Sequence, residues 1–288
     1  MRRRVSSSTE PIERGGAAIT GHEEQAAPKP RFGEEDRELS YGTYLRVPDL
    51  LGLQTLQSDP PARDELLFIV IHQAFELWFK EVLFELESIR EALFAGDTRR
   101  ARHYLRRVHT IERVLIQQLP VLETMSPQDF LEFRHNLAPA SGFQSVQFRE
   151  IEAISGLKEP GLVKRLGDSP GERDRLLRRM DEPTLWDGFC HLMNESGFPM
   201  PADDPVARRE SLVKLAWADR GYTELWAVAE SLLTHDENVA AWRQRHVLMV
   251  ERQIGGKTGT GGSTGAGYLR TTLDKRFYPE LWDLRSYL

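Results

Sequence analysis

One long segment with helical periodicity, residues 64–95, limits the possible folds more than any other part of the chain. At about 100° per residue, its apolar side chains fall on one stripe. The stripe comprises Phe68, Ile71, His72, Phe75, Phe79, Val82 and Leu86. Asp64 is a suitable N-terminal cap, and Gly96 follows the last periodic residue as a stop signal. A helix of this length has to bury its apolar stripe against other elements.

The rest of the chain also shows helical signals. Asp97 is a suitable cap for a second helix that ends at Leu119, just before Pro120. Residues 126–129 have the pattern of a third helix start, and this helix is predicted to reach about Leu137. The remaining predicted helices are several short ones within residues 140–220, a long one over 221–254, and short pieces around Tyr268 and Leu281. Because no Asn-Gly hairpin signal separates alternating strands, we predict an all-α fold, a single domain of packed helices.

Residues 1–38 differ in composition from the rest of the chain. They combine a basic start, a serine run and a mixture of Gly, Pro, Glu and Lys, so their hydrophobicity is low. No apolar stretch follows the basic start, as it would in a secretory signal. We therefore predict a disordered tail over residues 1–38 and a helical domain over residues 39–288.

Charge and apolar content argue against several classes of function. The chain carries 38 basic and 44 acidic residues and has no basic stripe with interleaved aromatic residues, so no nucleic-acid partner is expected. No apolar run approaches the roughly 18 residues of a membrane span. The single cysteine, Cys190, is flanked by Phe189 and Leu192, which favours a buried inert thiol over a nucleophile. We expect a protein of the reducing cytoplasm, with no internal disulfide and no cysteine-based zinc cage.

Residues 255–265 form a glycine-rich segment directly after the predicted long helix. Six of these eleven residues are Gly, which lets the backbone adopt positive φ and approach a ligand closely. Lys, Thr and Ser side chains between the glycines supply donors for anionic or polar groups. A phosphate-binding P-loop is excluded twice, because Glu251 stands where that motif needs Gly and because the segment follows a helix. The segment instead fits a substrate-gripping loop.

Two histidines lie on apolar helix faces, and two interpretations of them stay open. His72 lies within its aromatic stripe while Glu76 falls on another face; likewise His246 shares a face with Trp242 while Arg243 falls elsewhere. From position alone, each is more often a core histidine bonded to a backbone carbonyl. The alternative is a pocket for a flat aromatic ligand, which the pair and the glycine-rich segment together favour. Haem iron needs only one axial protein ligand, whereas no zinc-ligand spacing surrounds either histidine.

Arg134 is a third polar residue on an apolar face, which it shares with Phe130, Phe133 and Leu137. A buried guanidinium needs an anionic partner, because an unpaired buried charge is costly. One candidate partner is a structural Asp or Glu. The other is a ligand carboxylate, held bidentately by the guanidinium fork. Residues 141–145, just downstream, form a compact polar turn suited to a pocket wall.

In order and spacing, these clusters resemble the tryptophan 2,3-dioxygenase family over roughly residues 39–288. The segments that carry the resemblance are Tyr41-Gly42-Thr43-Tyr44-Leu45, residues 68–80 around His72, Phe133-Arg134, residues 139–145, Gln147-Phe148-Arg149, and Arg245-His246 through Gly262-Ser263. Each alone is moderately specific, whereas the ordered set is highly specific. The resemblance implies an enzyme that uses haem b and inserts both atoms of O₂ across the indole C2–C3 bond of L-tryptophan. The product is N-formylkynurenine, in the first step of tryptophan catabolism by the kynurenine pathway.

The resemblance also implies a role for individual residues. His246 would be the proximal ligand of the haem iron, with Ser141 and Gly142 beside the cofactor. His72 would lie near the indole N–H, either as a base or as a group that only orients the substrate. The implied substrate-binding residues are Phe68, His72, Phe130, Arg134, Thr260, Tyr41 and Tyr44. Among them, Arg134 would hold the carboxylate and Thr260 the ammonium group. Members of the family have Phe or Tyr at position 130, and this chain has Phe, so one hydroxyl is absent.

A homotetramer is implied as well, because in the family the segment with Tyr41 and Tyr44 reaches a neighbouring subunit's active site. Two other classes of protein remain possible from the residues alone. A non-catalytic haem- or oxygen-binding helical protein would need His246 but neither Arg134 nor Thr260, and a structural bundle would bind no ligand. A related indole dioxygenase with a broader substrate range is the remaining alternative within the enzyme class.

Overall fold

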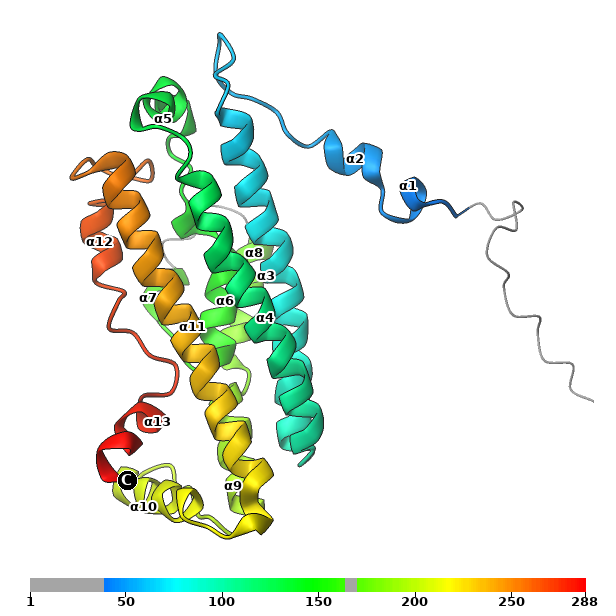
Figure 1. Cartoon of the computed structure of the whole chain (residues 1–288), viewed down its shortest axis with the longest axis vertical. Coiled ribbons are helices and arrows are strands. Elements are labelled where there is room, and N and C mark those ends of the chain that lie inside the picture. The colour runs from blue at the N-terminus through cyan, green and yellow to red at the C-terminus, as the bar shows by residue number, and fades with distance from the viewer. Residues whose placement is uncertain (1–38, 164–169) are drawn as a thin grey trace, which may run out of the picture. The chain divides into compact units, whose positions relative to one another are not determined.

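The computed structural model describes residues 39–163 and 170–288 of the chain (Figure 1). All regular structure in these two stretches is helical, which confirms the predicted all-α fold. The chain divides into two units, Met1–Leu51 and Gly52–Leu288. Only residues 39–51 of the first unit are described, and the predicted disordered tail, residues 1–38, lies outside the described residues.

The described part of the first unit consists of two short helices, α1 (Tyr41–Tyr44) and α2 (Val47–Leu51). Ser40 begins α1 with a reciprocal cap: its side chain accepts from the Thr43 N–H, and the Thr43 side chain accepts from the Ser40 N–H. Tyr41 and Tyr44 are 79% and 70% exposed. These helices are therefore ordered by local bonds and bury no side chain of their own within the described residues.

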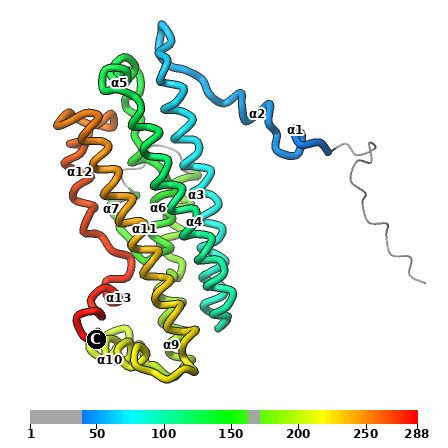
Figure 2. The backbone as a smooth tube through the Cα atoms, viewed as in Figure 1, coloured from blue at the N-terminus to red at the C-terminus, as the bar shows by residue number. Residues whose placement is uncertain are grey.

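Three long helices form the framework of the second unit: α3 (Glu65–Phe94), α4 (Thr98–Leu122) and α11 (Thr223–Ile254). A tight turn joins α3 to the antiparallel α4, which begins where the Asp97 side chain accepts from the Arg100 N–H. Helix α11 runs beside α4 in the same direction (Figure 2). The apolar stripes of the three helices meet in one core, whose fully buried members include Leu86, Ile89, Leu105, Val108 and Leu232.

Shorter helices complete the second unit. The α-helices are α5 (Pro127–Phe133), α6 (Val146–Ser155), α7 (Pro160–Val163), α8 (Pro170–Asp181), α9 (Leu185–Glu195), α10 (Pro205–Ala216), α12 (Ala266–Arg270) and α13 (Pro279–Leu284). The 3₁₀ helices are η1 (Arg134–Leu137), η2 (Gly142–Gln144), η3 (Arg220–Tyr222) and η4 (Arg285–Tyr287). Helix α6 packs on α3, one of the three framework helices.

The structure corrects three details of the predicted helices. Asp64 precedes α3 but makes no capping hydrogen bond, because its backbone is already helical. Pro120 lies inside α4, whose last turn continues to Leu122 because Leu119 and Leu122 are buried in the core. The third helix is α-helical only to Phe133 and continues as the 3₁₀ helix η1. For α4, tertiary packing overrides the local signal of Pro120.

Buried hydrogen bonds fasten neighbouring elements to the middle of α11. The two ring nitrogens of His235 bond the Ser155 hydroxyl of α6 at 2.8 Å and the Glu112 carboxylate of α4 at 2.5 Å. The next residue, Asp236, accepts three bonds from the C-terminal segment, from the N–H groups of Phe277 and Tyr278 and from Trp282 Nε1. The bond between His235 and Ser155 fixes the position of α6 relative to α11, and the Asp236 bonds hold the C-terminal segment against α11.

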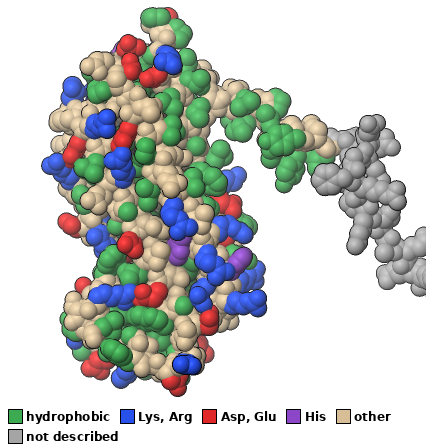
Figure 3. All heavy atoms as spheres, in the orientation of Figure 1, with side chains coloured by type: hydrophobic (Ala, Val, Ile, Leu, Met, Phe, Trp, Pro, Cys, Tyr) green, Lys and Arg blue, Asp and Glu red, His purple; other side chains and the backbone are tan. Residues whose placement is uncertain are grey.

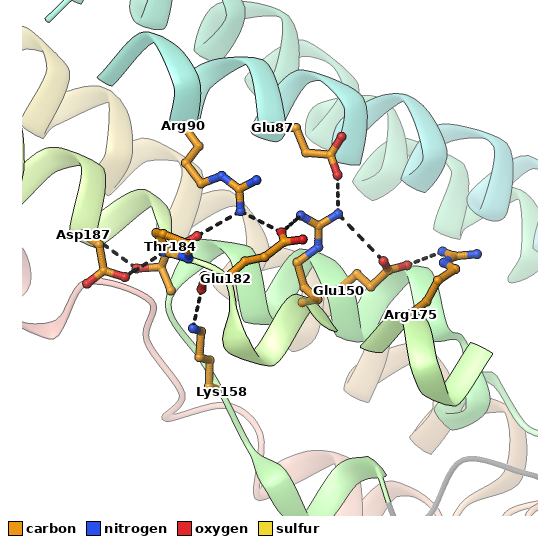
Figure 4. A network of polar contacts seen from close by, with 10 residues as sticks. Glu87, Arg90, Glu150, Lys158, Arg175, Glu182, Thr184 and Asp187 are labelled. Atoms are coloured by element: carbon orange, nitrogen blue, oxygen red, sulfur yellow. Dashed lines mark hydrogen bonds and ion pairs between the residues drawn. The ribbon is translucent and has the colours of Figure 1, made fainter. Parts of the chain in front are cut away.

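An ionic network attaches α8 to α3 and α6 (Figure 4). Arg179 of α8 forms ion pairs with Glu87 of α3, with Glu150 of α6 and with Glu182 just beyond α8. Arg90 of α3 reaches the same Glu182 carboxylate at 2.9 Å. Arg179 is almost fully buried, so its contacts are less screened by solvent than those of an exposed pair.

The outer face of α3 carries exposed apolar side chains. They are Leu66, Val70, Leu77 and Phe84, whose spacing places them on one side of the helix. Figure 3 shows hydrophobic groups at the surface on the side where α3 runs. None of the described helices combines the length and the apolar character that crossing a membrane requires.

Candidate active site

Eight helices and one loop line a cavity of about 260 Å³ in the second unit. Its walls come from α3, α4, α5, η1, η2, α6, α11 and α12, and from the glycine-rich loop at residues 255–265. The predicted site residues that line the cavity are Phe68, His72, Phe130, Arg134, Ser141, Gly142, His246 and Thr260. The fold therefore brings together residues that lie on separate segments of the sequence.

His72 lines the cavity and is also bonded to its own helix. Its Nδ1 lies 2.7 Å from the backbone carbonyl of Phe68, one turn earlier in α3. Burial lowers the pKa of His72, an effect that the Phe68 carbonyl and nearby Glu76 only partly oppose. A carbonyl can only accept, so the neutral ring carries its proton on Nδ1 and leaves the lone pair on Nε2. Both interpretations of His72 therefore hold, because the side chain is bonded to a backbone carbonyl and also lines the cavity.

His246 lines the cavity from α11 and is held by ring packing. Its imidazole lies against Trp242, with ring centroids 5.1 Å apart and planes 15° from parallel. Burial, with a smaller contribution from the nearby His72, lowers the pKa of His246 to about 4. The ring forms no hydrogen bond with any described residue. It is therefore a neutral imidazole with an available lone pair, which is the form that ligates a metal.

Aromatic rings form the cavity wall around His72. The Phe68 ring lies 4.1 Å from the His72 ring, centroid to centroid, and stacks on Phe130 at 5.7 Å. Phe133 packs edge-on against both phenylalanines. Such a wall excludes water and suits a flat apolar ligand. Because residue 130 is Phe, this wall offers no hydroxyl beside Arg134.

Arg134 begins η1, where the chain turns out of α5. Its Nη2 donates to the backbone carbonyl of Thr258 in the glycine-rich loop, and its Nε is buried without a partner. No Asp or Glu in the described ranges forms an ion pair with it, so a structural carboxylate is not what balances its charge. The guanidinium lines the cavity with hydrogen-bonding capacity to spare, which favours the ligand-carboxylate interpretation.

The glycine-rich loop packs closely on the turn at residues 139–142. The Thr260 hydroxyl donates to the Ala140 carbonyl at 2.7 Å. A Cβ at Gly261 would lie 2.6 Å from the Cβ of Ser141, so only Gly permits this approach. Ser141 in turn accepts from the Phe143 N–H and so begins η2. The loop is thus placed at the cavity by backbone proximity, which the sequence signalled only through its glycine content.

Sequence reasoning missed several cavity residues. Glu76 and Arg243 were placed on other helix faces, yet both line the cavity. Arg243 is buried and forms an ion pair with Glu152 at 2.8 Å, and the partly buried Glu76 accepts from the Gln147 side chain. A helical projection sorts residues by polarity and does not see partners on other helices. Arg149 also forms an ion pair with Glu152, three residues later on α6. This spacing, typical of a pair on one helix face, is the one signal in the sequence for the group of Arg149, Glu152 and Arg243.

Tyr41 and Tyr44 belong to α1 in the first unit. Their side chains are exposed, and their predicted contact with a neighbouring subunit stays a prediction. Cys190, by contrast, is partly buried in α9, and burial raises the pKa of its thiol to about 12. A thiol with this pKa stays protonated at neutral pH and is a poor nucleophile, in agreement with its predicted inert character.

Comparison with known proteins agrees with this arrangement. A sequence model of the family described as tryptophan 2,3-dioxygenase matches residues 24–168 and 209–288. The chain is 54% identical over 263 residues to a tryptophan 2,3-dioxygenase of Nocardioides sp. (strain ATCC BAA-499 / JS614), which covers 89% of this chain and 97% of that protein. It is 45% identical over 257 residues to one from Herpetosiphon aurantiacus (86% and 98%), and 39% identical over 265 residues to one from Caulobacter vibrioides (88% and 99%).

The chain belongs to the tryptophan 2,3-dioxygenase family. The predicted resemblance is thereby confirmed. Residues that line the cavity fall within the two stretches matched by the family model. The stretch between them, residues 169–208, contains α8 and α9, which contribute no residue to the lining of the cavity. Arg179 attaches α8 to α3 through its ion pair with Glu87.

Proposed function

We propose that this chain is a haem-dependent enzyme that inserts both atoms of O₂ across the indole C2–C3 bond of L-tryptophan and yields N-formylkynurenine. The observation that carries the proposal is the common cavity of two neutral histidines and one arginine that lacks a carboxylate partner among the described residues. A haem protein without turnover would have no use for the arginine. The reaction would be the first step of tryptophan catabolism by the kynurenine pathway.

The residues of the cavity fit haem b. His246 offers a neutral ring nitrogen whose orientation is fixed by the stacked Trp242, and a single axial histidine suffices to hold haem iron. Ser141 and Gly142 line the same cavity and would border the cofactor. When bound, haem supplies the redox chemistry with O₂, which no amino-acid side chain provides.

The remaining residues would bind and orient L-tryptophan. His72 Nε2, as a hydrogen-bond acceptor, suits the indole N–H, and the rings of Phe68 and Phe130 suit the indole face. Arg134 would bind the carboxylate, and Thr260 the ammonium group. Because the aromatic wall excludes water, these polar contacts would be stronger than they are in solution. Holding the reactants in one geometry is a large part of what an enzyme contributes to a two-substrate reaction.

The reaction is tested with haem-loaded protein reduced by ascorbate. Incubation with L-tryptophan and ¹⁸O₂ is expected to give N-formylkynurenine in which both added oxygen atoms carry the label, as measured by mass spectrometry. A product with one labelled oxygen would indicate a monooxygenase, and an absence of product would contradict the proposal. Activity on D-tryptophan or tryptamine equal to that on L-tryptophan would instead indicate an indole dioxygenase of broad substrate range.

His72→Ala is expected to keep haem and to lower kcat/KM for L-tryptophan by roughly ten- to a hundredfold. A hydrogen bond that orients the substrate supplies about 1.5–3 kcal/mol, which corresponds to that range. A matched control is 1-methyl-L-tryptophan, which has no indole N–H and should therefore lose little rate in the variant. Complete inactivity with unchanged substrate affinity would mean that His72 is an obligatory base, and full activity would remove it from the site.

We also propose a cytoplasmic homotetramer in which residues 39–45 of one subunit complete the active site of a neighbour. Two observations support an assembly. Tyr41 and Tyr44 expose aromatic rings with polar tips, a combination that is frequent at interfaces. The four exposed apolar residues on the outer face of α3 provide a second apolar surface that a partner subunit would cover.

Truncation at two positions separates the proposed roles of the N-terminal residues. A chain of residues 39–288 is expected to remain a tetramer with wild-type turnover, because the proposed shared segment is retained. A chain of residues 47–288 should lose most activity and tetramer stability, because Tyr41 and Tyr44 are gone. Steady-state kinetics and light scattering after size exclusion measure both properties. A fully active monomer of residues 47–288 would refute the shared site and the interface together.

A further inference from the structure

Three charged side chains form a buried cluster in the cavity wall, two from α6 and one from α11. Arg149 Nη1 donates to one oxygen of Glu152 at 2.5 Å, and Arg243 Nη2 donates to the other at 2.8 Å. Arg149, Glu152 and Arg243 are only 8%, 2% and 3% exposed. All three line the cavity. The cluster therefore places charge where solvent screens it weakly.

The charges of this cluster do not balance. Two guanidinium groups share one carboxylate, which leaves one positive charge without a counterion among the described residues. Arg243 also donates to the Lys275 carbonyl at 3.0 Å, whereas Arg149 has no second acceptor in the described part of the chain and its Nε is buried without a partner. Glu76 also lines the cavity, but it is engaged by Gln147 and forms no ion pair with Arg149 within residues 39–163 and 170–288.

Aromatic rings hold the Arg149 guanidinium in place and connect it to the His246 wall. The guanidinium lies over Phe143 at 4.9 Å and over Phe148 at 5.1 Å, each to the ring centroid. Phe148 contacts Trp242 at 5.0 Å, and Trp242 is the residue stacked on His246. Cation–π contacts fix a guanidinium without neutralising it. Arg149 is thus oriented, desolvated and short of one anion, on the side of the cavity next to Trp242.

We propose that Arg149 is a carboxylate-binding residue of this cavity and that the carboxylate is a propionate of the haem. The inference rests on the proposed function, since it requires haem as the cofactor. Two sources of carboxylate would enter the cavity, the substrate and the cofactor. Arg134 begins η1 directly after Phe133, which packs on Phe68, so Arg134 is available to the substrate. Arg149 packs on Phe148, which contacts Trp242, so Arg149 is available to the cofactor. A buried cation that lacks a counterion is strongly destabilising, and a bound propionate would supply that counterion.

The test measures how fast haem leaves the full-length protein for an excess of a tighter haem scavenger, followed by the Soret band. Arg149→Gln is expected to lose haem faster by on the order of ten- to a hundredfold, the factor that one charge-assisted hydrogen bond supplies. Wild-type protein loaded with haem dimethyl ester, whose propionates are neutral, should lose its cofactor faster by a similar factor. In Arg149→Gln, replacement of haem by its dimethyl ester should change the rate of cofactor loss little further. Arg209→Gln, which removes a guanidinium from over Tyr287 outside the cavity, should leave the rate unchanged.

Other outcomes would overturn the inference in distinguishable ways. Equal haem loss in wild type and Arg149→Gln would make Arg149 structural, while a normal Soret band would leave the proposed function intact. Unchanged haem loss with weaker binding of L-tryptophan but not of tryptamine would assign the carboxylate to the substrate. If Arg149→Gln does not fold, Arg149→Lys is the deciding variant, because it keeps the charge but not the guanidinium fork. It should lose haem faster than wild type does, and this difference between variant and wild type should be smaller when both carry the dimethyl ester. A wild-type protein that binds no haem would refute the proposed function itself.

Discussion

His246→Ala will yield a folded protein that no longer retains haem. Its imidazole is the neutral, metal-competent ring on α11, and it forms no hydrogen bond with a described residue that would give it another task. Removing an outer-shell partner of a metal ligand already costs roughly 10–100-fold in affinity, so removal of the ligand itself should cost more than about a hundredfold. The Soret band and the haem content after gel filtration measure the loss.

A second histidine variant serves as the control for this experiment. His103 lies exposed on α4, where it contacts Arg106 of the same helix, so His103→Ala should keep full haem occupancy. Far-UV circular dichroism of both variants separates haem loss from unfolding. If His246→Ala keeps full haem occupancy and an unchanged spectrum, another side chain is the axial ligand and the assignment is wrong.

Arg134→Leu is expected to weaken binding of L-tryptophan far more than binding of tryptamine, which lacks the carboxylate. A charge-assisted bidentate contact in a dry pocket is worth about 2–5 kcal/mol when one partner is removed, a factor of at least about 30 in Kd. The substitution also removes the hydrogen bond to the Thr258 carbonyl. Any resulting disturbance of the loop affects both ligands, so the difference between them isolates the carboxylate contact.

Spectroscopic titration of the haem-loaded variant with each ligand gives the two affinities. An equal loss for L-tryptophan and tryptamine would show that Arg134 acts only by holding the loop. An unchanged affinity for both would exclude it from the site. Because leucine is apolar, like Phe130 and Phe133 on the same face, the packing of these two buried rings should survive the substitution.

The sequence was informative wherever the signal is local. The stripe of α3, the Asp97 cap and the start at residues 126–129 all depend on neighbours within one turn, and each was predicted correctly. The continuation of α4 through Pro120 was not, because it depends on the burial of Leu122 against other helices. Helix type and position follow from periodicity, whereas exact ends depend on tertiary contacts.

The residues of the candidate site show the same difference between what local sequence signals reveal and what depends on tertiary contacts. His72 and His246 became candidates because two histidines on apolar helix faces, together with the glycine-rich segment, favoured a ligand pocket. The burial of Arg243 could not, since it depends on Glu152, which lies on another helix far away in the sequence. The meeting of the glycine-rich loop with residues 139–142 also required the fold. The family resemblance supplied what physical reasoning on single segments lacked, namely which separate segments act together.

The contact between Arg134 and the Thr258 carbonyl has a consequence for how a substrate would enter. A backbone carbonyl of the loop already accepts from Nη2 of the guanidinium, and the Ala140 carbonyl accepts from the Thr260 hydroxyl, whose oxygen can still accept from an ammonium group. The Thr258 carbonyl is therefore an internal competitor of the substrate carboxylate for Nη2, present at a fixed effective concentration that dilution does not change. The measured affinity for L-tryptophan is then the equilibrium constant for exchange of the loop carbonyl for the substrate carboxylate on Arg134. A carboxylate displaces a neutral carbonyl from a guanidinium readily, whereas an indole without a carboxylate has nothing to exchange, so the loop itself contributes to selectivity for the amino acid.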